Sequence, residues 1–323
     1  MKIKRTITSL LTAAMLATAL AGCQNTSEAS KVQSANDEQN SQAAVAETTA
    51  PPDLYSDIDD MISKMTVEEK VGQLFYVNCR GNDMSDAINK YHIGGVLLFG
   101  VDFDGKTKEK VNADINAMQS NAKIPLIIGT DEEGGTVVRA SDNPKLRESA
   151  YLSPSETFAN GGWSAVEDDA YDKAEFLLSL GVNVNMAPVC DITSAPDSFM
   201  YYRSFSSDAA STSRFVDTVV KASKEKKLGT VLKHFPGYGD NGDTHYSDAT
   251  DNRAFSVLQN NDFLPFKAGI AAGADSILVS HITVNSIDSD NPASLSEPVH
   301  EVIRDTLKFD GVEIGRASCR EKV

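Results

Sequence analysis

Cysteine is scarce in this chain, and its spacing excludes two kinds of fold. The four cysteines are Cys23, Cys79, Cys190 and Cys319, and no two of them form a Cys-x-x-Cys pair. This spacing argues against a zinc site and against a small fold stapled by disulfides. Cys79 and Cys190 follow apolar runs, so we expect them to be small core residues and not nucleophiles.

Positive charge is also in short supply. The 323 residues include 30 Lys and Arg against 46 Asp and Glu, which gives a formal net charge of −16. Such a chain would not neutralise phosphates, so we do not expect a nucleic-acid partner. Hydrophobic residues make up 41% of the sequence, and the length is enough for one large α/β barrel or two ordinary domains.

The sequence also lacks a dinucleotide-binding motif after its first predicted strand and a long apolar run after its N-terminus. No Gly-x-Gly-x-x-Gly follows the first predicted strand, residues 73–77, which disfavours a dinucleotide-binding doubly wound sheet. After residue 20, no apolar run approaches the roughly 20 residues that a membrane-spanning helix needs. We therefore do not expect an integral membrane protein.

The N-terminus has the pattern of a secretory signal. A positive stretch beginning at Lys2 precedes apolar residues 7–20, and small residues come immediately before Cys23. This order is typical of bacterial lipoprotein signals, so we expect residues 1–22 to be removed and Cys23 to be lipidated. The protein would then be extracytoplasmic and anchored by lipid to the bacterial cell membrane. An ordinary signal peptide with an incidental cysteine is the alternative.

Beyond the signal, the chain divides into a tether and a folded region. Residues 23–52 are mostly Ser, Gln, Asn, Ala, Glu and Thr, so we expect a disordered tether. From residue 53 to residue 312, short apolar runs alternate with amphipathic stretches, which is typical of parallel βαβ units. The expected strands cover residues 73–77, 94–99, 125–131, 182–188, 229–232, 276–281 and a last one that begins at 311.

Ionisable residues follow several of these strands directly. They are Asp131, Asp191, Lys233, His234 and His281. Because the carboxyl ends of parallel strands meet at one face of a barrel, this clustering favours an α/β fold of the TIM (β/α)8 type, with the active site on that face. A doubly wound sheet is the alternative. The barrel would be incomplete, since its seventh strand is interrupted and an eighth is missing.

The fifth strand opens into a glycine-rich loop. Residues 231–248 run from a buried strand into this loop, which carries Asp243 and His245 one residue apart. A carboxylate so placed can orient and polarise an imidazole, which then exchanges protons near neutral pH. The glycines would let the loop move over a substrate. A solvated polar loop is the alternative, and the Lys233-His234 pair disfavours it.

Several short motifs run through the folded region in order. They are Met65-Thr-Val-Glu-Glu-Lys-Val-Gly-Gln-Leu74, Ile93-Gly-Gly-Val-Leu-Leu-Phe-Gly100, Asp131-Glu-Glu-Gly-Gly135, Gly181-Val-Asn-Val-Asn-Met-Ala-Pro-Val189, Arg203-Ser-Phe205, Lys233-His-Phe-Pro-Gly237, Asp243-Thr-His245, Pro292-Ala-Ser-Leu-Ser296 and Phe309-Asp-Gly-Val312. Over residues 54–312 the chain thus resembles the N-terminal barrel domain of glycoside hydrolase family three, in its β-N-acetylglucosaminidase (β-hexosaminidase) branch.

The resemblance implies retaining hydrolysis of terminal β-linked N-acetylglucosamine in cell-wall-derived or related oligosaccharides, with no cofactor and no metal. His245 would be the general acid/base and Asp243 its partner. The residues that would hold the sugar are Asp131, Arg203, Lys233, His234 and His281. A mutual salt bridge between Lys233 and Asp131 is compatible with that role. Asp191 is expected to be structural or to cap a loop.

The sequence departs from the family pattern near its end. The family carries a nucleophilic aspartate soon after strand seven begins, whereas Arg316 stands at that position here. Glu313 lies inside the strand, too early to replace it. Residues 313–323 fit no element, and we expect them to be a non-native tail, with a divergent inactive relative as the alternative. The chain as written would then bind sugar weakly and not turn it over. A milder departure is Tyr238, where the family often has histidine.

Three other functions stay open. Without the aspartate, the protein could be a sugar-binding lipoprotein that does not catalyse. A metal-dependent barrel hydrolase could use His234, His245 and His281, although the His-x-His that such barrels place on their first strand is absent. A β-glucosidase of the same family is disfavoured by the Asp243-x-His245 pair, because those enzymes generally take their acid/base from a second domain.

Overall fold

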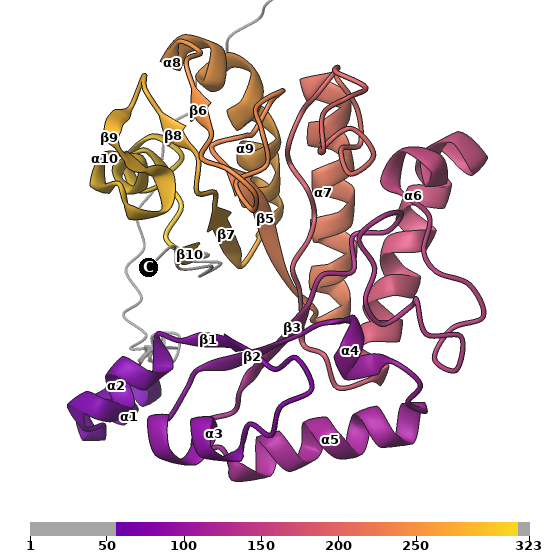
Figure 1. Ribbon diagram of the computed structural model, residues 1–323, viewed down its shortest axis with the longest axis vertical. Coiled ribbons are helices and arrows are strands. Elements are labelled where there is room, and N and C mark those ends of the chain that lie inside the picture. Colours follow the sequence, from indigo (N-terminus) through magenta and orange to yellow (C-terminus); the bar gives the residue numbers. More distant parts are fainter. Residues whose placement is uncertain (1–55, 316–323) are drawn as a thin grey trace, which may run out of the picture. The chain divides into compact units, whose positions relative to one another are not determined.

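The structure is a computed structural model, and it describes residues 56–315 (Figure 1). The expected signal peptide, tether and lipidated Cys23 lie outside the described residues, and so does Arg316. Among the described residues, no helix is both long enough and apolar enough to cross a membrane.

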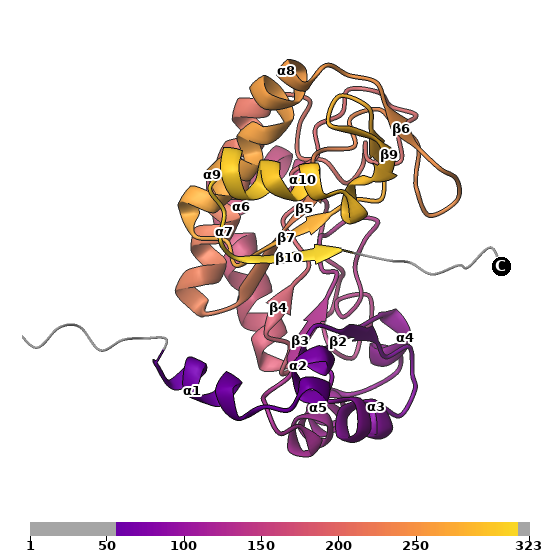
Figure 2. The ribbon, with the colours of Figure 1, turned by 90° about the vertical axis from the view of Figure 1, so that its left-hand side faces the viewer.

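A parallel sheet of seven strands forms the centre of the fold. Its strands are β1 (Tyr76–Asn78), β2 (Gly95–Leu98), β3 (Ile127–Thr130), β4 (Val184–Asn185), β5 (Gly229–Phe235), β7 (Ser276–Val279) and β10 (Val312–Gly315). They lie side by side in chain order, and Figure 2 shows β7 between β5 and β10. A doubly wound sheet reverses its order at a switch point, so this order excludes that alternative. The fold is the α/β barrel type that the sequence predicts.

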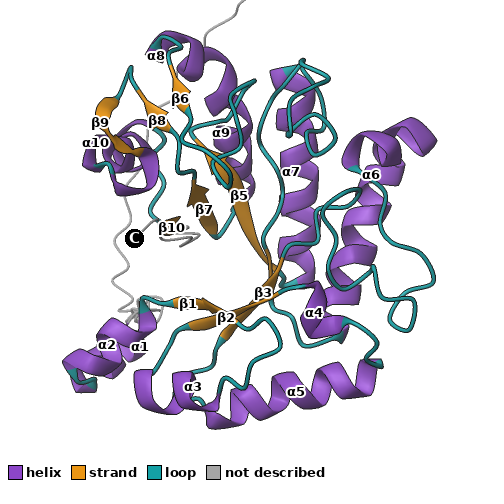
Figure 3. Ribbon diagram, viewed as in Figure 1, coloured by secondary structure: helices purple, strands orange, loops and turns teal. Residues whose placement is uncertain are grey.

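Helices cover one side of the sheet, which curls around the other side (Figure 3). This one-sided cover is typical of barrels, because a barrel fills its interior with strand side chains. The helices are α1 (Ser56–Lys64), α2 (Val67–Gln73), α3 (Ser85–Tyr91), α4 (Gly100–Phe103), α5 (Lys108–Asn121), α6 (Pro154–Ser179), α7 (Ala209–Lys226), α8 (Phe255–Val257), α9 (Phe263–Ala272) and α10 (Glu297–Glu301). A second, small sheet consists of β6 (Thr250–Asp251), β8 (Thr283–Val284) and β9 (Asp288–Pro292).

Local sequence signals explain where two of the helices begin. At α2, the Thr66 hydroxyl accepts a hydrogen bond from the Glu69 amide at 3.2 Å, and the Glu69 carboxylate accepts one from the Thr66 amide at 2.9 Å. Ser153 and Glu156 form the same capping box at the start of α6, with Pro154 as the first helical residue. Each box satisfies amides that the first turn of a helix leaves unpaired.

The strand bounds differ from the prediction at both ends of the sheet. The first strand was expected at residues 73–77, but α2 extends to Gln73 and β1 begins at Tyr76. At the other end, β10 pairs with β7 over four residues. The expectation that residues 313–323 fit no element is therefore wrong for residues 313–315. Within the described residues β1 and β10 are edge strands, so these residues alone do not close the barrel.

The barrel interior is a small apolar cluster. It consists of Leu97, Met186, Val231 and Leu278, with Ile314 packed against it. Because side chains alternate across a strand, Glu313 faces the helices, where it contacts His300 and Arg304. Glu313 therefore points away from the barrel interior. Two larger apolar clusters fill the space between the sheet and its helices.

Candidate active site

A buried ion-pair network lies at the carboxyl end of the sheet, with the Lys233 ammonium at its centre. Lys233 Nζ lies 2.7 Å from Asp131 Oδ1 and 2.6 Å from Glu133 Oε1. Only 1% of the Lys233 side chain is exposed. A buried ammonium needs such partners, because burial otherwise removes the hydration that stabilises its charge. The Lys233–Asp131 salt bridge considered from the sequence is thus present, and Asp131 directly follows β3.

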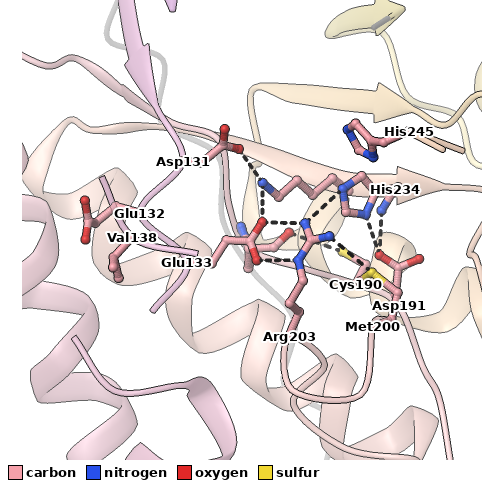
Figure 4. Close-up of polar contacts among 12 residues, drawn as sticks. Asp131, Glu132, Glu133, Val138, Cys190, Asp191, Met200, Arg203, His234 and His245 are labelled. Carbon is pink, nitrogen blue, oxygen red and sulfur yellow. Dashed lines mark hydrogen bonds and ion pairs between the residues drawn. The ribbon is translucent and has the colours of Figure 1, made fainter. Parts of the chain in front are cut away.

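Arg203 brings the second positive charge, from the loop that precedes α7. Its Nε and Nη2 atoms donate to the two oxygens of Glu133 at 2.9 and 2.7 Å, which is a bidentate pair. Figure 4 shows Arg203 between Glu133 and His234. Burial opposes ionisation of Glu133, but Lys233 and Arg203 outweigh it and hold the pKa of this carboxyl well below its usual range. Glu133 is therefore an anion.

Glu133 is a site residue that the sequence prediction missed. The available signal was the run Asp131-Glu-Glu133 at the end of a buried strand. The middle residue of this run, Glu132, points away from the network. Its carboxylate accepts a hydrogen bond from the Ala140 amide at 2.8 Å. Glu132 therefore fixes the loop after β3 and does not take part in the network.

His234 is oriented by Asp191, the aspartate that follows β4. His234 Nδ1 lies 2.7 Å from Asp191 Oδ2, and the His234 amide donates to the same oxygen at 3.0 Å. Burial lowers the pKa of His234, and the attraction of Asp191 only partly opposes it. A neutral ring with its proton on Nδ1 can accept at Nε2, which lies 3.3 Å from Arg203 Nη2. Asp191 is thus structural, as expected, and it also sets the tautomer of His234.

The Asp243–His245 pair lies outside this network. His245 Nδ1 is 2.6 Å from Asp243 Oδ1, and the side chains are 41% and 22% exposed, respectively. Figure 4 shows His245 on the side of His234, with no bond to the residues of the network. Because Asp243 occupies Nδ1, Nε2 is the nitrogen that can exchange a proton with a bound molecule. The loop thus presents an oriented imidazole to solvent.

The remaining predicted site residue, His281, is separate from both groups. It is exposed, and its Nδ1 lies 2.6 Å from the hydroxyl of Ser294. His234, His245 and His281 therefore each have a different partner. In residues 56–315, no group of three or more His, Cys, Asp and Glu side chains is arranged to hold a metal ion.

The two described cysteines are poor nucleophiles. Burial raises the pKa of Cys79 to about 11, and it raises the pKa of Cys190 well above its ordinary value. A thiol needs its thiolate form to attack, so neither residue is set up for covalent chemistry near neutral pH. Both are buried, as the sequence predicts for small core residues.

Residues 100–107 have the spacing Gly-x-x-x-x-Gly-Lys-Thr of a phosphate-binding loop. The structure does not support that function. Residues 100–103 form α4, and Lys106 is paired with Asp114 at 2.9 Å. The loop also contains the buried carboxylate of Asp102, which accepts from the Phe99 amide and would repel a phosphate.

Together, these groups can recognise a neutral polyhydroxylated molecule and transfer a proton to it. The network offers cationic donors and carboxylate acceptors in fixed positions, which suits adjacent hydroxyl groups. The exposed imidazole of His245 is a proton donor or acceptor. Both features lie at the carboxyl end of parallel strands, where barrel enzymes place their active sites.

Comparison with known proteins identifies relatives over most of the chain. The model of the glycosyl hydrolase family 3 N terminal domain matches residues 66–318. The beta-hexosaminidase LpqI of Mycobacterium tuberculosis is 31% identical over 250 residues, which are 74% of this chain and 61% of the relative. The beta-hexosaminidase of Xanthomonas campestris pv. campestris is 31% identical over 239 residues, 70% of each protein.

Solved structures show the same similarity. A glycoside hydrolase family 3 beta-N-acetylglucosaminidase from Paenibacillus sp. superimposes with a TM-score of 0.73 and 28% identity, over 78% of this chain and 49% of that chain. A beta-N-acetylhexosaminidase from Beutenbergia cavernae has a TM-score of 0.69 and 26% identity, over 79% of each chain. The chain thus spans about half of the first structure and about three fifths of LpqI.

Proposed function

Because the chain belongs to glycosyl hydrolase family 3, we propose that it is an exported, retaining glycoside hydrolase that removes terminal β-linked N-acetylglucosamine from cell-wall-derived or related oligosaccharides. The beta-hexosaminidase names of its relatives support this activity. The observation that carries the proposal is the Asp243–His245 pair, 2.6 Å apart, on the loop that follows Lys233 and His234.

In the proposed reaction, His245 is the general acid/base. Protonated His245 gives its Nε2 proton to the leaving glycosidic oxygen, and the same nitrogen later takes a proton from the attacking water. Asp243 fixes the tautomer through Nδ1 and stabilises the imidazolium form. The glycines of the loop would let the acid approach the oxygen after the sugar has bound.

In this proposal, the buried ion-pair network holds the sugar. Asp131 accepts bonds from sugar hydroxyls, while Arg203 and Lys233 supply donors and positive potential near the ring. Retention also needs a carboxylate nucleophile. Among residues 56–315 we assign that role to none, since the carboxylates of the network are held by cations and Glu313 faces the helices.

The test is hydrolysis of a chromogenic β-N-acetylglucosaminide by the protein expressed from its native gene. Release of the chromophore should fall by about two orders of magnitude or more in His245→Ala, because general acid catalysis contributes about 10²–10⁴-fold. No release by the native protein, or an unchanged rate in the variant, would refute the proposal.

A sugar-binding lipoprotein without catalysis is the second candidate. It is favoured by one observation, namely that the described residues supply a holding network and a proton donor but no available carboxylate nucleophile. Calorimetry separates the two functions. Heat of binding for N-acetylglucosamine, together with no chromophore release by the native gene product, would establish the binding protein.

We also propose that the protein is anchored to the cell membrane by a lipid on Cys23. The support is the order of positive, apolar and small residues before this cysteine. A radiolabelled fatty acid supplied to expressing cells should label the protein, and Cys23→Ser should remove the label and release the protein from the membrane fraction. Equal labelling of the variant would contradict the anchor.

A further inference from the structure

An open cavity of about 670 Å³ is lined by residues that lie close to Arg203 and Glu133 in the chain. Tyr202 and Ser204, which flank Arg203 in the chain, line it, and so does Thr136 from the loop after Glu133. Its volume is in the range of roughly 300–1,000 Å³ that is typical of small-molecule sites. The cavity is therefore large enough for a ligand, and it shares its walls with the backbone that holds the ion pair.

Two adjacent tyrosines give this cavity an aromatic wall. The rings of Tyr201 and Tyr202 meet edge to face with centroids 5.2 Å apart, and these side chains are 39% and 64% exposed. Exposed aromatic rings are suited to packing against the C–H face of a sugar ring, while their hydroxyls stay free for polar contacts. Two such residues side by side are typical of a surface that binds a flat, amphipathic ligand.

The rest of the lining is rich in hydroxyl groups. The Ser and Thr residues that line the cavity are Thr136, Ser153, Ser155, Thr193, Ser194, Ser204, Ser206 and Ser207. Ser204 is only 4% exposed, and its Oγ has no hydrogen-bond partner among residues 56–315. The exposed hydroxyls among these residues can exchange hydrogen bonds with the hydroxyl groups of a neutral ligand, whereas Ser204 Oγ itself is buried away from the cavity.

A second cavity extends the first one toward the acid/base loop. It has a volume of about 550 Å³ and shares Thr193, Ser194 and Ser207 with the first. Its far end is lined by Gly239 and Asp240, at the base of the loop that carries His245. We call the two cavities together the tyrosine groove. It leads from the loop with the proton donor to the tyrosine pair.

The charges along the tyrosine groove are negative or neutralised. In the first cavity, Glu156 is the only charged side chain among the described lining residues. In the second cavity, the cation Arg253 is already paired with Asp251 at 2.7 Å and Asp262 at 2.8 Å. A ligand with carboxylates would therefore meet repulsion and find no available cation among the described lining residues.

We propose that the tyrosine groove binds the leaving-group part of an uncharged β-linked oligosaccharide, with Tyr201 and Tyr202 as the stacking surface. The inference rests on the proposed function, because the leaving sugar must lie on the side of the loop whose His245 protonates the glycosidic oxygen. It narrows the substrate to neutral N-acetylglucosamine oligosaccharides and disfavours saccharides that carry lactyl or peptide carboxylates.

Calorimetry on the 323-residue chain tests the groove without requiring turnover. The probes are N-acetylglucosamine and its β-1,4-linked disaccharide. The disaccharide should bind about tenfold more tightly, a gain consistent with one aromatic contact. Tyr201→Ala/Tyr202→Ala should abolish this gain and leave the affinity for the monosaccharide unchanged.

The outcomes separate the groove from the proposed function. If the monosaccharide binds but the disaccharide gains nothing, or if the gain survives in the tyrosine variant, the groove is refuted and the function is not. If the disaccharide binds through the tyrosines while the native gene product releases no chromophore, the proposed hydrolysis fails, and the tyrosine groove remains a binding surface for the second sugar that has no leaving group. Binding of neither sugar would refute the groove as well.

A neutral and an acidic disaccharide together test the preference of the tyrosine groove for uncharged ligands. A disaccharide with the same non-reducing sugar but a lactyl carboxylate on the second ring should bind less tightly than the neutral one. The difference should shrink in high salt and in Glu156→Gln, which keeps the capping box of α6 because glutamine also caps. Equal or tighter binding of the acidic disaccharide at low salt would overturn the assignment to uncharged ligands.

Discussion

The phenol oxygen of Tyr238 lies 2.6 Å from the hydroxyl of Thr244, the residue that precedes His245. The amide of Tyr238 donates to Asp191 at 2.8 Å, and Asp191 also holds His234. One buried tyrosine thus connects the buried histidine to the exposed loop with the acid/base. Tyr238 is the loop position at which we expected the sequence to depart from the family pattern.

Tyr238→Phe should loosen the loop while leaving the fold intact. The ring would still pack edge to face against Phe199, and only the hydroxyl would be lost. One hydrogen bond contributes about 0.5–1.5 kcal/mol. Hydrogen–deuterium exchange of the loop amides at residues 239–248 should therefore become roughly twofold to tenfold faster, while exchange in α7 stays the same.

Thr244→Val is the matched variant, because it removes the other half of the same bond. It should accelerate exchange of the loop to the same extent, and the double variant should show little further change, since both substitutions delete one interaction. Additive effects of the two substitutions would show that Tyr238 and Thr244 act separately.

Lys233→Met should destabilise the protein strongly. The substitution keeps the bulk of the side chain but leaves Asp131 and Glu133 buried without their shared cation. Removing one partner of a buried ion pair costs about 3–5 kcal/mol, because the remaining charge loses its compensation. Urea unfolding followed by circular dichroism should show this loss in the free energy of unfolding.

Lys221→Met is the control for that experiment. Lys221 pairs with Asp217 at 2.8 Å on α7, and 64% of its side chain is exposed. Water already screens this pair, so its loss should change the free energy of unfolding by less than about 1 kcal/mol. A similar effect of the two substitutions would mean that the network at the barrel mouth contributes no more than a surface pair.

Acid should destabilise the fold in two stages. Burial lowers the pKa of His234 from 6.5, so the unfolded chain binds this proton first and stability declines as the pH falls below about 6.5. The pKa of Glu133 is also lowered from 4.5, mainly by Lys233 against the effect of burial, so its contribution is lost as the pH falls below about 4.5. Thermal unfolding between pH 8 and pH 3 follows the first stage and the beginning of the second, and His234→Asn should remove the first. A midpoint that is constant from pH 7 to pH 5 would contradict it.

The fold could be predicted because apolar runs and helical periods alternate along the chain, and that alternation alone indicates parallel βαβ units. Element bounds could not be predicted equally well. The run at residues 182–188 looks like one long strand, yet the regular strand covers only Val184–Asn185. The side chain of Asn185 binds the backbone of Glu132 in the loop after β3. Such tertiary contacts are not visible in a local pattern.

The candidate site, too, could be predicted from the sequence only in part. Strand ends indicated Asp131, Lys233 and His234, because parallel strands deliver their carboxyl ends to one face. The sequence could not show which of the carboxylates at residues 131–133 join the network, since that depends on how the chain turns after β3. Glu133 turns toward Lys233 and Arg203. His281 also follows a strand, but the loop after β7 directs it to Ser294.

Gly237→Ala and Gly242→Ala should have opposite consequences although both glycines lie in the acid/base loop. Gly237 has φ 116°, and a Cβ there would lie 2.7 Å from Asp262 Oδ1. Asp262 is buried and held by Arg253, so it cannot easily move away. At Gly242 a Cβ would meet no atom within 4 Å.

Gly237→Ala should therefore lower the free energy of unfolding by about 1–3 kcal/mol, because it combines a left-handed backbone with a steric clash. Gly242→Ala should be neutral, or should stabilise by less than about 1 kcal/mol by restricting the unfolded chain. Thermal unfolding of the two variants compares them directly. If both were neutral, the turn after β5 would not depend on glycine at all. If both substitutions lowered the free energy of unfolding, glycine would be needed throughout the loop and not only at the turn after β5.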